Sequence, residues 1–383
     1  MTTTETTVTR KQRPDGAWVW QVTQYDAVKT LLTDHRLGMS LPDPESPGWD
    51  ADPKVHQILM RMATGGRRGI AADQEDRVMR RRIMNKLFAG PNVVRVKPLI
   101  GPMAEQLADE LRSRPQPADL GRNFSAPLCA LTMNELIGVP REDMHRFREW
   151  MDEASASGDG QPGSGLRHFV VYINKLFAER KRNPVDGDIM TDILEPHERG
   201  DERHERRLLN ILVWMLGMGW QNPSATVDFA VSLLLTNPGQ LDLLKDDLSL
   251  LPGAVEEAIR LYNSQPPNDG MVVRYAVEDF EFDGAAISIG DKVMLDIWAA
   301  NRDGSVFADP LKFDITRDPN PHIGFGHGVY ACNFGQVTRA EVEASIAALV
   351  DALPGLRPAV PADELQYTTP DRPSGLVRFP VLW

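Results

Sequence analysis

The sequence has very little cysteine, no long apolar segment and no excess of positive charge. Two cysteines in 383 residues exclude a disulfide framework. No apolar run reaches the ~20 residues that span a bilayer, and the polar start MTTTETTVTRKQRPDG lacks the apolar core of a secretory signal. A net charge of −12 argues against a general nucleic-acid binder. These absences predict a cytoplasmic protein that binds neither membrane nor nucleic acid.

The apolar residues that are present recur mostly at helical spacing, so a mostly α protein with small β-sheets is expected. Strand patterns are fewer and lie at residues 16–23, 270–297 and 374–383. A Gly/Ser-rich stretch at 154–165 reads as a loop. Helices are predicted within residues 24–37, 93–114, 124–140, 163–184, 201–238 and 253–263.

The second cysteine lies in an unusual setting. Cys129 is inside the apolar run APLCALTMNEL, where burial as a small hydrophobe explains it. Cys332 instead lies in FGHGVYACNFG, among glycines that allow tight turns, and just before a predicted helix whose N–H groups would stabilise a thiolate. A buried hydrophobe, a nucleophile and a metal ligand are the three alternatives. No CxxC pair supports zinc and no local base supports a nucleophile, whereas a lone thiolate on such a loop suits an axial ligand to haem iron.

This loop resembles the haem-binding loop of the cytochrome P450 family, whose usual form is F-G-x-G-x-H-x-C-x-G. Phe325, Gly326 and Cys332 match, while Tyr330 replaces the usual histidine and Phe334 replaces the glycine after the cysteine. The resemblance implies haem b with Cys332 as the iron ligand and Phe325 and Gly326 at the cofactor.

Other motifs of the family follow in the expected order. EEAIR supplies the E-x-x-R pair as Glu257 and Arg260, and Arg317 stands where the family provides a third partner. The similarity covers nearly the whole chain. It therefore implies a single cytochrome P450 domain over residues 1–383, with a shortened N-terminal helix region and residues 1–15 as a disordered tail.

The segment ADQEDRVMRRRIMNKLF resembles the family helix that contacts the haem propionates. Arg77 and Arg81 are four residues apart and therefore share one face of a helix. Arg274 lies on a predicted strand where the family places another propionate contact. With Tyr330, these residues are expected to bind the cofactor, while a solvated basic face is the alternative that holds for Arg80 and Arg82.

The long predicted helix departs from the family pattern A-G-x-E/D-T-T. Alignment places Gly219 at the glycine, Gln221 at the acid, Asn222 at the first threonine and Pro223 at the second. In the family the acid and the alcohol organise water and deliver protons during oxygen activation. Carboxamides hold water by hydrogen bonds but cannot supply protons as a carboxylic acid does. Gly219, Gln221 and Asn222 are the predicted catalytic positions.

Three functions are compatible with this departure. The first, placed slightly ahead, is oxidative coupling of an aromatic Trp- or Tyr-derived small molecule such as a cyclodipeptide or short peptide, with C–C or C–N bond formation in secondary metabolism. The second is regioselective hydroxylation of a natural-product intermediate. The third is a non-catalytic scaffold, which the retained Cys332 disfavours.

The resemblance also implies a set of partners and a substrate pocket. An oxygen-using P450 oxidoreductase would receive electrons from ferredoxin and ferredoxin reductase, and we expect a monomer. Trp220 is equally compatible with packing and with the pocket. The predicted substrate contacts are Leu216, Trp220, Met271, Val272 and Gly375.

Overall fold

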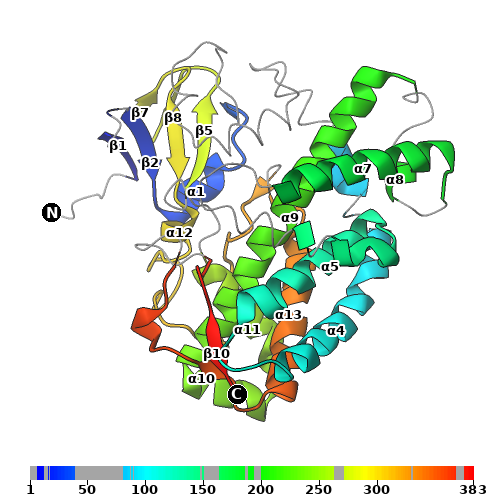
Figure 1. The fold of residues 1–383 in the computed structure, drawn as a ribbon. Helices are drawn as coiled ribbons and strands as arrows, with labels where there is room; N and C mark the ends of the chain where they lie inside the picture. The colour runs from blue at the N-terminus through cyan, green and yellow to red at the C-terminus, as the bar shows by residue number, and fades with distance from the viewer. Residues whose placement is uncertain are drawn as a thin grey trace.

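The computed structural model describes residues 7–12, 16, 18–38, 81–86, 88, 90–146, 149–150, 164–185, 189–193, 200–262, 271–328, 331–367 and 375–383. Within these ranges helix predominates and strands are short, which confirms the predicted helix-rich class. Figure 1 shows a β-rich part beside the N-terminus and a larger group of helices that contains α4, α5, α9, α11 and α13.

The helices follow the predicted apolar periods closely. Proline occupies the first turn of α4, α5, α10 and α11, where its missing N–H costs nothing. The longest helix, Glu202–Thr236, continues without interruption through Pro223. The described helices are α1 (Tyr25–Leu31), α4 (Gly90–Arg112), η2 (Gly121–Ser125), α5 (Ala126–Ile137), η3 (Arg141–Asp143), α7 (Ser164–Arg182), α8 (Ile189–Asp192), α9 (Glu202–Thr236), α10 (Pro238–Asp246), η5 (Leu248–Leu250), α11 (Leu251–Leu261), α12 (Ile297–Ala300), α13 (Gly335–Ala352) and η7 (Ala362–Glu364).

Three sheets hold the described strands. The largest has the order β1-β2-β8-β5-β3, with β2 and β8 parallel and the other pairs antiparallel. A second sheet has the order β4-β10-β9, and β6 pairs with β7. The strands are β1 (Val8–Gln12), β2 (Trp18–Val22), β3 (Leu37–Gly38), β4 (Ala118–Asp119), β5 (Val272–Ala276), β6 (Phe280–Phe282), β7 (Ala285–Ile287), β8 (Lys292–Leu295), β9 (Arg357–Pro358) and β10 (Pro380–Leu382).

The expected disordered tail at residues 1–15 is wrong for Val8–Gln12, which form β1. This strand pairs with β2 in antiparallel register from Val8 opposite Val22 to Gln12 opposite Trp18. The guanidinium of Arg10 lies 5.3 Å from the ring centroid of Trp18. Cross-strand pairing and this cation–π contact stabilise a segment whose polar composition resembled a tail. The single-domain organisation stays a prediction.

The hydrophobic core has two main parts. One lies between the helices, where α13 packs on α4 and α9 while α5 packs on α4 and α9. The other joins the large sheet to α1 and α12. The Cys332 loop leads directly into α13, so packing of α13 between α4 and α9 fixes where Cys332 lies.

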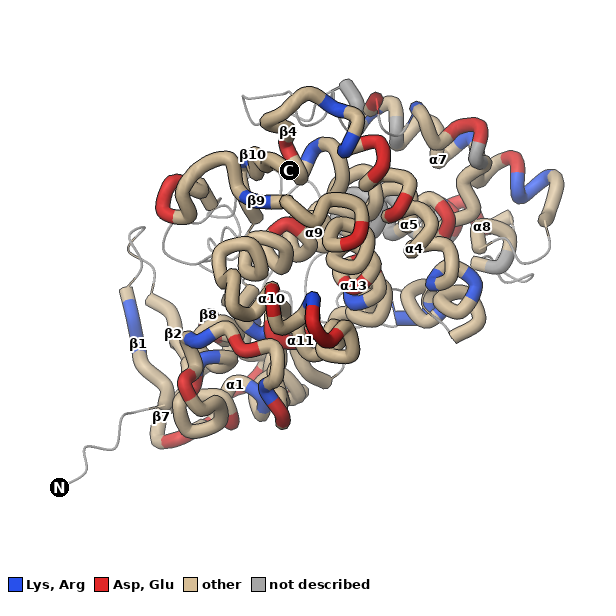
Figure 2. Tube along the Cα trace, turned by 90° about the horizontal axis from the view of Figure 1, so that it is seen from below, with Lys and Arg blue, Asp and Glu red and all other residues tan. Residues whose placement is uncertain are grey.

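Along the described part of the chain, charges of both signs are interspersed (Figure 2). In Figure 2, Lys and Arg positions lie among Asp and Glu positions along the described trace. Within the described residues, none of the helices has both the length and the apolar character to cross a membrane.

Candidate active site

The residues before α13 fold back on themselves and present Cys332 on a cavity wall. The backbone N–H of Cys332 donates to the carbonyl oxygen of Phe325 at 2.8 Å, which closes the loop. Gly326 and Gly328 have φ angles of 74° and 73°, in the left-handed region that favours glycine. The glycines of the motif are therefore required by the backbone path that exposes the sulfur.

The Cys332 thiol lies in an electrostatic environment with opposing effects. Burial by the surrounding protein raises its pKa, whereas the backbone N–H groups of Phe334 and Gly335 and the charge of Arg339 lower it; the net shift is upward. The side chain is nevertheless accessible from the cavity. Two amide donors at the start of an 18-residue helix are thus aimed at a sulfur that a ligand can reach.

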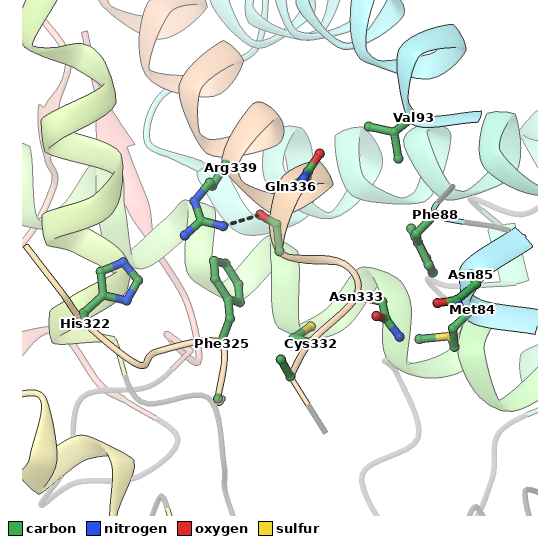
Figure 3. A pocket seen from close by; sticks show the side chains of 13 residues that line it. Met84, Asn85, Phe88, Val93, His322, Phe325, Cys332, Asn333, Gln336 and Arg339 are labelled. Carbon is green, nitrogen blue, oxygen red and sulfur yellow. Dashed lines mark hydrogen bonds between the residues drawn. The ribbon is translucent and has the colours of Figure 1, made fainter. Parts of the chain in front are cut away.

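A cavity of about 590 Å³ opens at this cysteine. Figure 3 shows Cys332 between Phe325 and Asn333, with Phe88 and Met84 on the opposite wall. Phe325 and Gly326, both predicted at the cofactor, line this cavity with Cys332, whereas Phe88 and Met84 were not identified as candidates. The lining residues are Met84, Asn85, Phe88, Val93, His322, Phe325, Gly326, Ala331, Cys332, Asn333, Gly335, Gln336 and Arg339.

An ion cluster holds Arg339 beside the cavity. Its Nη2 atom donates to Glu256 Oε2 at 2.8 Å, and His322 Nε2 lies 2.8 Å from the same oxygen. Burial would raise the pKa of Glu256, but the hydrogen bonds with His322 and Arg339 and the charge of Arg339 lower it to about 2. The guanidinium of Arg339 also lies 4.7 Å from the ring centroid of Phe325. The cluster therefore fixes a positive charge near Cys332.

The predicted E-x-x-R interaction is confirmed. Arg260 donates from Nε and Nη2 to the two carboxylate oxygens of Glu257, each at 2.7 Å, and both side chains are fully buried. Arg317 Nε lies 3.1 Å from both oxygens of Glu257, as the motif order predicted. This paired and hydrogen-bonded cluster attaches the segment before the Cys332 loop to α11.

The centre of α9 contacts the cysteine loop through Gly219. A Cβ atom built at Gly219 would lie 2.9 Å from Cε1 and Cζ of Phe334 and 2.9 Å from Cε of Met133. The Phe334 ring in turn packs on Phe88 with centroids 4.2 Å apart. The departure from the family pattern at Phe334 therefore lies next to the departure in α9, because the Phe334 ring fills the space directly beside Gly219.

The predicted relay residues, Gln221 and Asn222, follow Gly219 in α9. Gln221 is exposed, Asn222 is partly buried and Pro223 is buried. Ser224 Oγ donates to the carbonyl of Gln221 at 2.9 Å, and Thr226 Oγ1 donates to the carbonyl of Asn222 at 2.8 Å. Nearby hydroxyls thus bond to the helix backbone, and the catalytic role of Gln221 and Asn222 stays a prediction.

The predicted cofactor arginines are described only in part. Arg77 and Tyr330 lie outside the described residues. Arg81 is exposed on the helical segment 81–86. Arg274 is buried on β5 and its Nη1 donates to the carbonyl of Val273 at 2.8 Å. Their proposed contact with propionates stays a prediction.

The predicted substrate residues do not share one described cavity. The Leu216 side chain lies outside the described set, although its backbone is in α9. Trp220 lines a second cavity beside α5, while Met271 packs with Val19 and Met294. Val272 packs against the sheet core, and a Cβ at Gly375 would lie 2.8 Å from Cβ of Ala225. These five residues were predicted to share a pocket only because the sequence resembles the family.

One buried carboxyl was missed by the sequence reasoning. Asp228 on α9 is 6% exposed and accepts a hydrogen bond from Ser125 Oγ at 2.6 Å. Burial raises its pKa to about 7, opposed by the Ser125 hydrogen bond and assisted by the charge of Asp119. An acid within the apolar run VDFAVSLLL was the signal that could have identified it.

The residues around Cys332 fit a haem bound through its sulfur. The cavity exposes the thiol, two backbone amides face it and an aromatic ring lies beside it. Among the described residues, no group of three His, Cys, Asp or Glu side chains could hold a metal ion by itself. A single accessible thiolate suits a metal cofactor that brings its other ligands with it.

Comparison with known proteins agrees with this chemistry. Residues 166–350 match the family model described as Cytochrome P450. The chain is 30% identical over 383 residues to the mycinamicin IV hydroxylase/epoxidase of Micromonospora griseorubida, covering 98% of this chain and 92% of the relative. It is 32% identical to the vitamin D(3) 25-hydroxylase of Pseudonocardia autotrophica over 378 residues, covering 96% and 88%.

Solved structures give the same result for the fold. The ligand-free form of wild-type CYP105P1 matches with a TM-score of 0.82 and 25% identity, covering 99% of this chain and 94% of that chain. The mixed-function P450 MycG matches with a TM-score of 0.77 and 28% identity over 99% and 94%. The chain therefore belongs to the cytochrome P450 family and has its fold. It is an oxidoreductase of the monooxygenase class, whose haem iron is held by an axial cysteine thiolate.

Proposed function

We propose that this protein is a bacterial P450 of secondary metabolism that hydroxylates or epoxidises a natural-product intermediate. Its support is the accessible Cys332 sulfur at the start of α13, combined with similarity over almost the whole chain to a relative named as a hydroxylase/epoxidase and to another named as a hydroxylase. Relatives named as a nocardicin C N-oxygenase and a pentalenolactone synthase also support a role in natural-product metabolism.

The residues of this chain have distinct parts in that function. Haem bound at Cys332 supplies oxygen activation. The N–H groups of Phe334 and Gly335 stabilise the thiolate, and Phe325 covers it on one side. Arg77, Arg81, Arg274 and Tyr330 would pair with the propionates. Gln221 and Asn222 would hold water by their carboxamides, so protons would come from that water rather than from a side-chain acid.

Electron supply is part of the same proposal. Bacterial enzymes of this class receive electrons from ferredoxin and ferredoxin reductase. We infer that this chain uses such partners and acts on a small molecule. A cytoplasmic location and a monomeric state remain expectations.

Oxidative coupling of an aromatic substrate is the second candidate, and the centre of α9 favours it. An amide, an amide and a proline replace the acid and alcohols of the usual relay. Coupling draws hydrogen atoms from N–H, O–H or C–H groups of the substrate, so it depends less on such a relay. Trp- or Tyr-derived cyclodipeptides and short peptides have rings that are suitable for this chemistry.

The haem site is tested by two matched cysteine substitutions. The reduced CO complex of the wild type should show the absorption band of thiolate ligation. Cys332→Ser should lose this band, and Cys129→Ser, at a fully buried position in α5, should keep it. Wild-type protein that is isolated without haem after expression with haem supply would refute both enzymatic functions.

The two reactions are separated by labelled dioxygen. Indole and phenol compounds and polyketide or terpenoid intermediates are first screened by the haem binding spectrum, and binders are then turned over. Oxygen insertion incorporates one labelled atom per product, whereas coupling incorporates none. Unlabelled, dehydrogenated and coupled product would contradict the leading proposal and support the second candidate.

Restoring the relay gives a second measurement. Asn222→Thr with Gln221→Glu should leave an oxygenated product unchanged while more of the reducing equivalents appear in product. For a coupling enzyme, the same pair should divert turnover toward oxygen insertion or wasted oxygen.

A further inference from the structure

A second cavity lies beside α9, apart from the Cys332 cavity. Its volume is about 790 Å³, and its walls come from α4, α5, α9, the segment after η3 and the last residues of the chain. Among the described residues, none lines both cavities. Of the residues predicted to contact haem or substrate or to act as the relay, Trp220 is in the described lining of this cavity.

Antiparallel packing of α5 and α9 gives the cavity two different ends. Ser125 contacts Asp228 at one end through a 2.6 Å hydrogen bond. Met133 meets the Gly219 position at the other, where Met133 Cε lies 2.9 Å from a Cβ built there. Asn134 in α5 lies nine positions after Ser125, the last residue of η2, which corresponds to ~13 Å at about 1.5 Å per residue.

One end of the cavity holds two carboxylates, and the lining also includes Arg122 and Arg378. Asp228 lines it as a buried carboxyl, and Asp119 adds a second carboxylate. A Cβ at Gly121 would lie 2.7 Å from Asp228 Oδ2, so only a residue without a side chain leaves this oxygen uncovered there. Arg378 lies 3.7 Å from Asp119 but its side chain is 78% exposed, so its charge is largely screened by solvent.

The other end presents a donor without a partner. Asn134 is 3% exposed, and within the described residues its Nδ2 atom has no hydrogen-bond partner. It lines the same cavity as Asp228. An unsatisfied buried donor is unfavourable, so a ligand oxygen beside Asn134 would supply the hydrogen-bond partner that this atom lacks.

The space between the two ends is mainly apolar. Pro127, Ala130, Leu131 and the partly buried ring of Trp220 line it. An apolar chain or ring system can therefore connect a group at Asp228 to a group at Asn134.

We propose that this cavity is a second ligand site that binds a small amphipathic amine. The ammonium group pairs with Asp228, and an oxygen ~13 Å away accepts a hydrogen bond from Asn134, with the apolar part on Pro127, Leu131 and Trp220. The site contacts α9 on either side of Gln221 and Asn222, since Trp220 and Ser224 belong to its lining. Its existence does not depend on which reaction the haem site performs.

The ionisation of Asp228 gives the site a pH dependence. Its pKa, raised to about 7, means that the carboxyl is largely neutral at pH 6 and largely ionised at pH 8. Asp119, Cys129 and Tyr262 interact with it electrostatically, and Arg122 and Arg378 line the same cavity. Burial keeps Cys129 and Tyr262 neutral, because it raises the pKa of both groups well above their usual values. Affinity for an amine should therefore rise about tenfold between pH 6 and pH 8.

The test is calorimetric titration of the haem-loaded protein with ω-aminodecanamide, whose extended chain carries an amine and an amide at opposite ends. Decylamine and decanamide, which each lack one polar end, should bind more weakly. Asp228→Asn should weaken binding about tenfold or more, and Asn134→Ala about threefold to tenfold. Leu131→Trp should abolish binding because the larger indole side chain would fill the cavity.

Controls separate this site from general effects. Glu105→Gln on the exposed face of α4 and Asn174→Ala on α7 should leave affinity unchanged. His145→Gln, at a titratable lining residue, should leave the pH dependence in place. The CO band of every variant reports that the fold and haem site persist. Undetectable binding to wild type, equal affinity of Asp228→Asn and wild type, or equal affinity for decylamine and ω-aminodecanamide would overturn the proposal.

Discussion

The contact between Gly219 and Phe334 predicts an energetic coupling that can be measured. Alanine at Gly219 would place its Cβ 2.9 Å from Cε1 and Cζ of Phe334. The Met133 methyl, at the same distance, is the flexible end of a side chain and can move. The Phe334 ring cannot move as easily, because it packs on Phe88 with centroids 4.2 Å apart. Gly219→Ala is therefore a test of how rigidly the cysteine loop is held against α9.

The magnitude follows from two opposing effects. Replacing glycine by alanine inside a helix stabilises by about 1 kcal/mol. Overpacking a filled site costs about 1–3 kcal/mol. Gly219→Ala should therefore lower the free energy of unfolding by about 0–2 kcal/mol. In a Phe334→Ala background the ring is gone, so the same substitution should stabilise by about 1 kcal/mol, which gives a coupling energy of about 1–3 kcal/mol.

The assay is urea unfolding of the four haem-loaded proteins, followed by tryptophan fluorescence and by haem absorbance. Gly101→Ala is the matched control, because Gly101 lies within α4 and a Cβ there meets nothing within 4 Å. It should stabilise by about 1 kcal/mol in either background. Additive effects of Gly219→Ala and Phe334→Ala, within about 0.5 kcal/mol, would refute the reasoning.

Three further predictions concern buried and paired carboxylates. Asp228 has a folded pKa of about 7, above its usual 3.8, so its contribution to stability is lost as pH rises through this window. Relative to Asp228→Asn, the free energy of unfolding of the wild type should fall by on the order of 4 kcal/mol between pH 4 and pH 8. Equal changes in the wild type and the variant, measured by urea unfolding, would contradict this. Glu256 has a lowered pKa, so its contribution is present above its unfolded value and disappears as pH falls; Glu256→Gln should reduce the difference in stability between pH 7 and pH 3, measured by thermal unfolding. Glu257→Gln leaves Arg260 buried with a weakened partner and should cost about 3–5 kcal/mol in urea unfolding; a loss below 1 kcal/mol would mean that solvent reaches this cluster.

Several features could be predicted because their physical cause is local in the sequence. The glycines around Cys332 specify a left-handed turn that few other residues adopt, and the apolar period after them specifies a helix. The pair Glu257 and Arg260 is three residues apart on a helix, so helix geometry alone brings the two side chains together.

Other features depended on partners that the sequence does not specify by spacing. The strand at Val8–Gln12 exists because β2 lies beside it, although its composition resembles a tail. Phe334 looked like a departure within one motif, and only packing showed that its ring occupies the space beside Gly219.

The sequence by itself determined the cysteine loop, the helix-rich class and the family, because these rest on short motifs with fixed backbone requirements. The tertiary structure alone decided which groups are buried together. Ser125 and Asp228 are 103 positions apart, and their 2.6 Å contact forms because η2 packs on α9. Burial in that contact, rather than the identity of the residue, raises the Asp228 pKa to about 7. A property set by desolvation arises only when the chain has folded around the group.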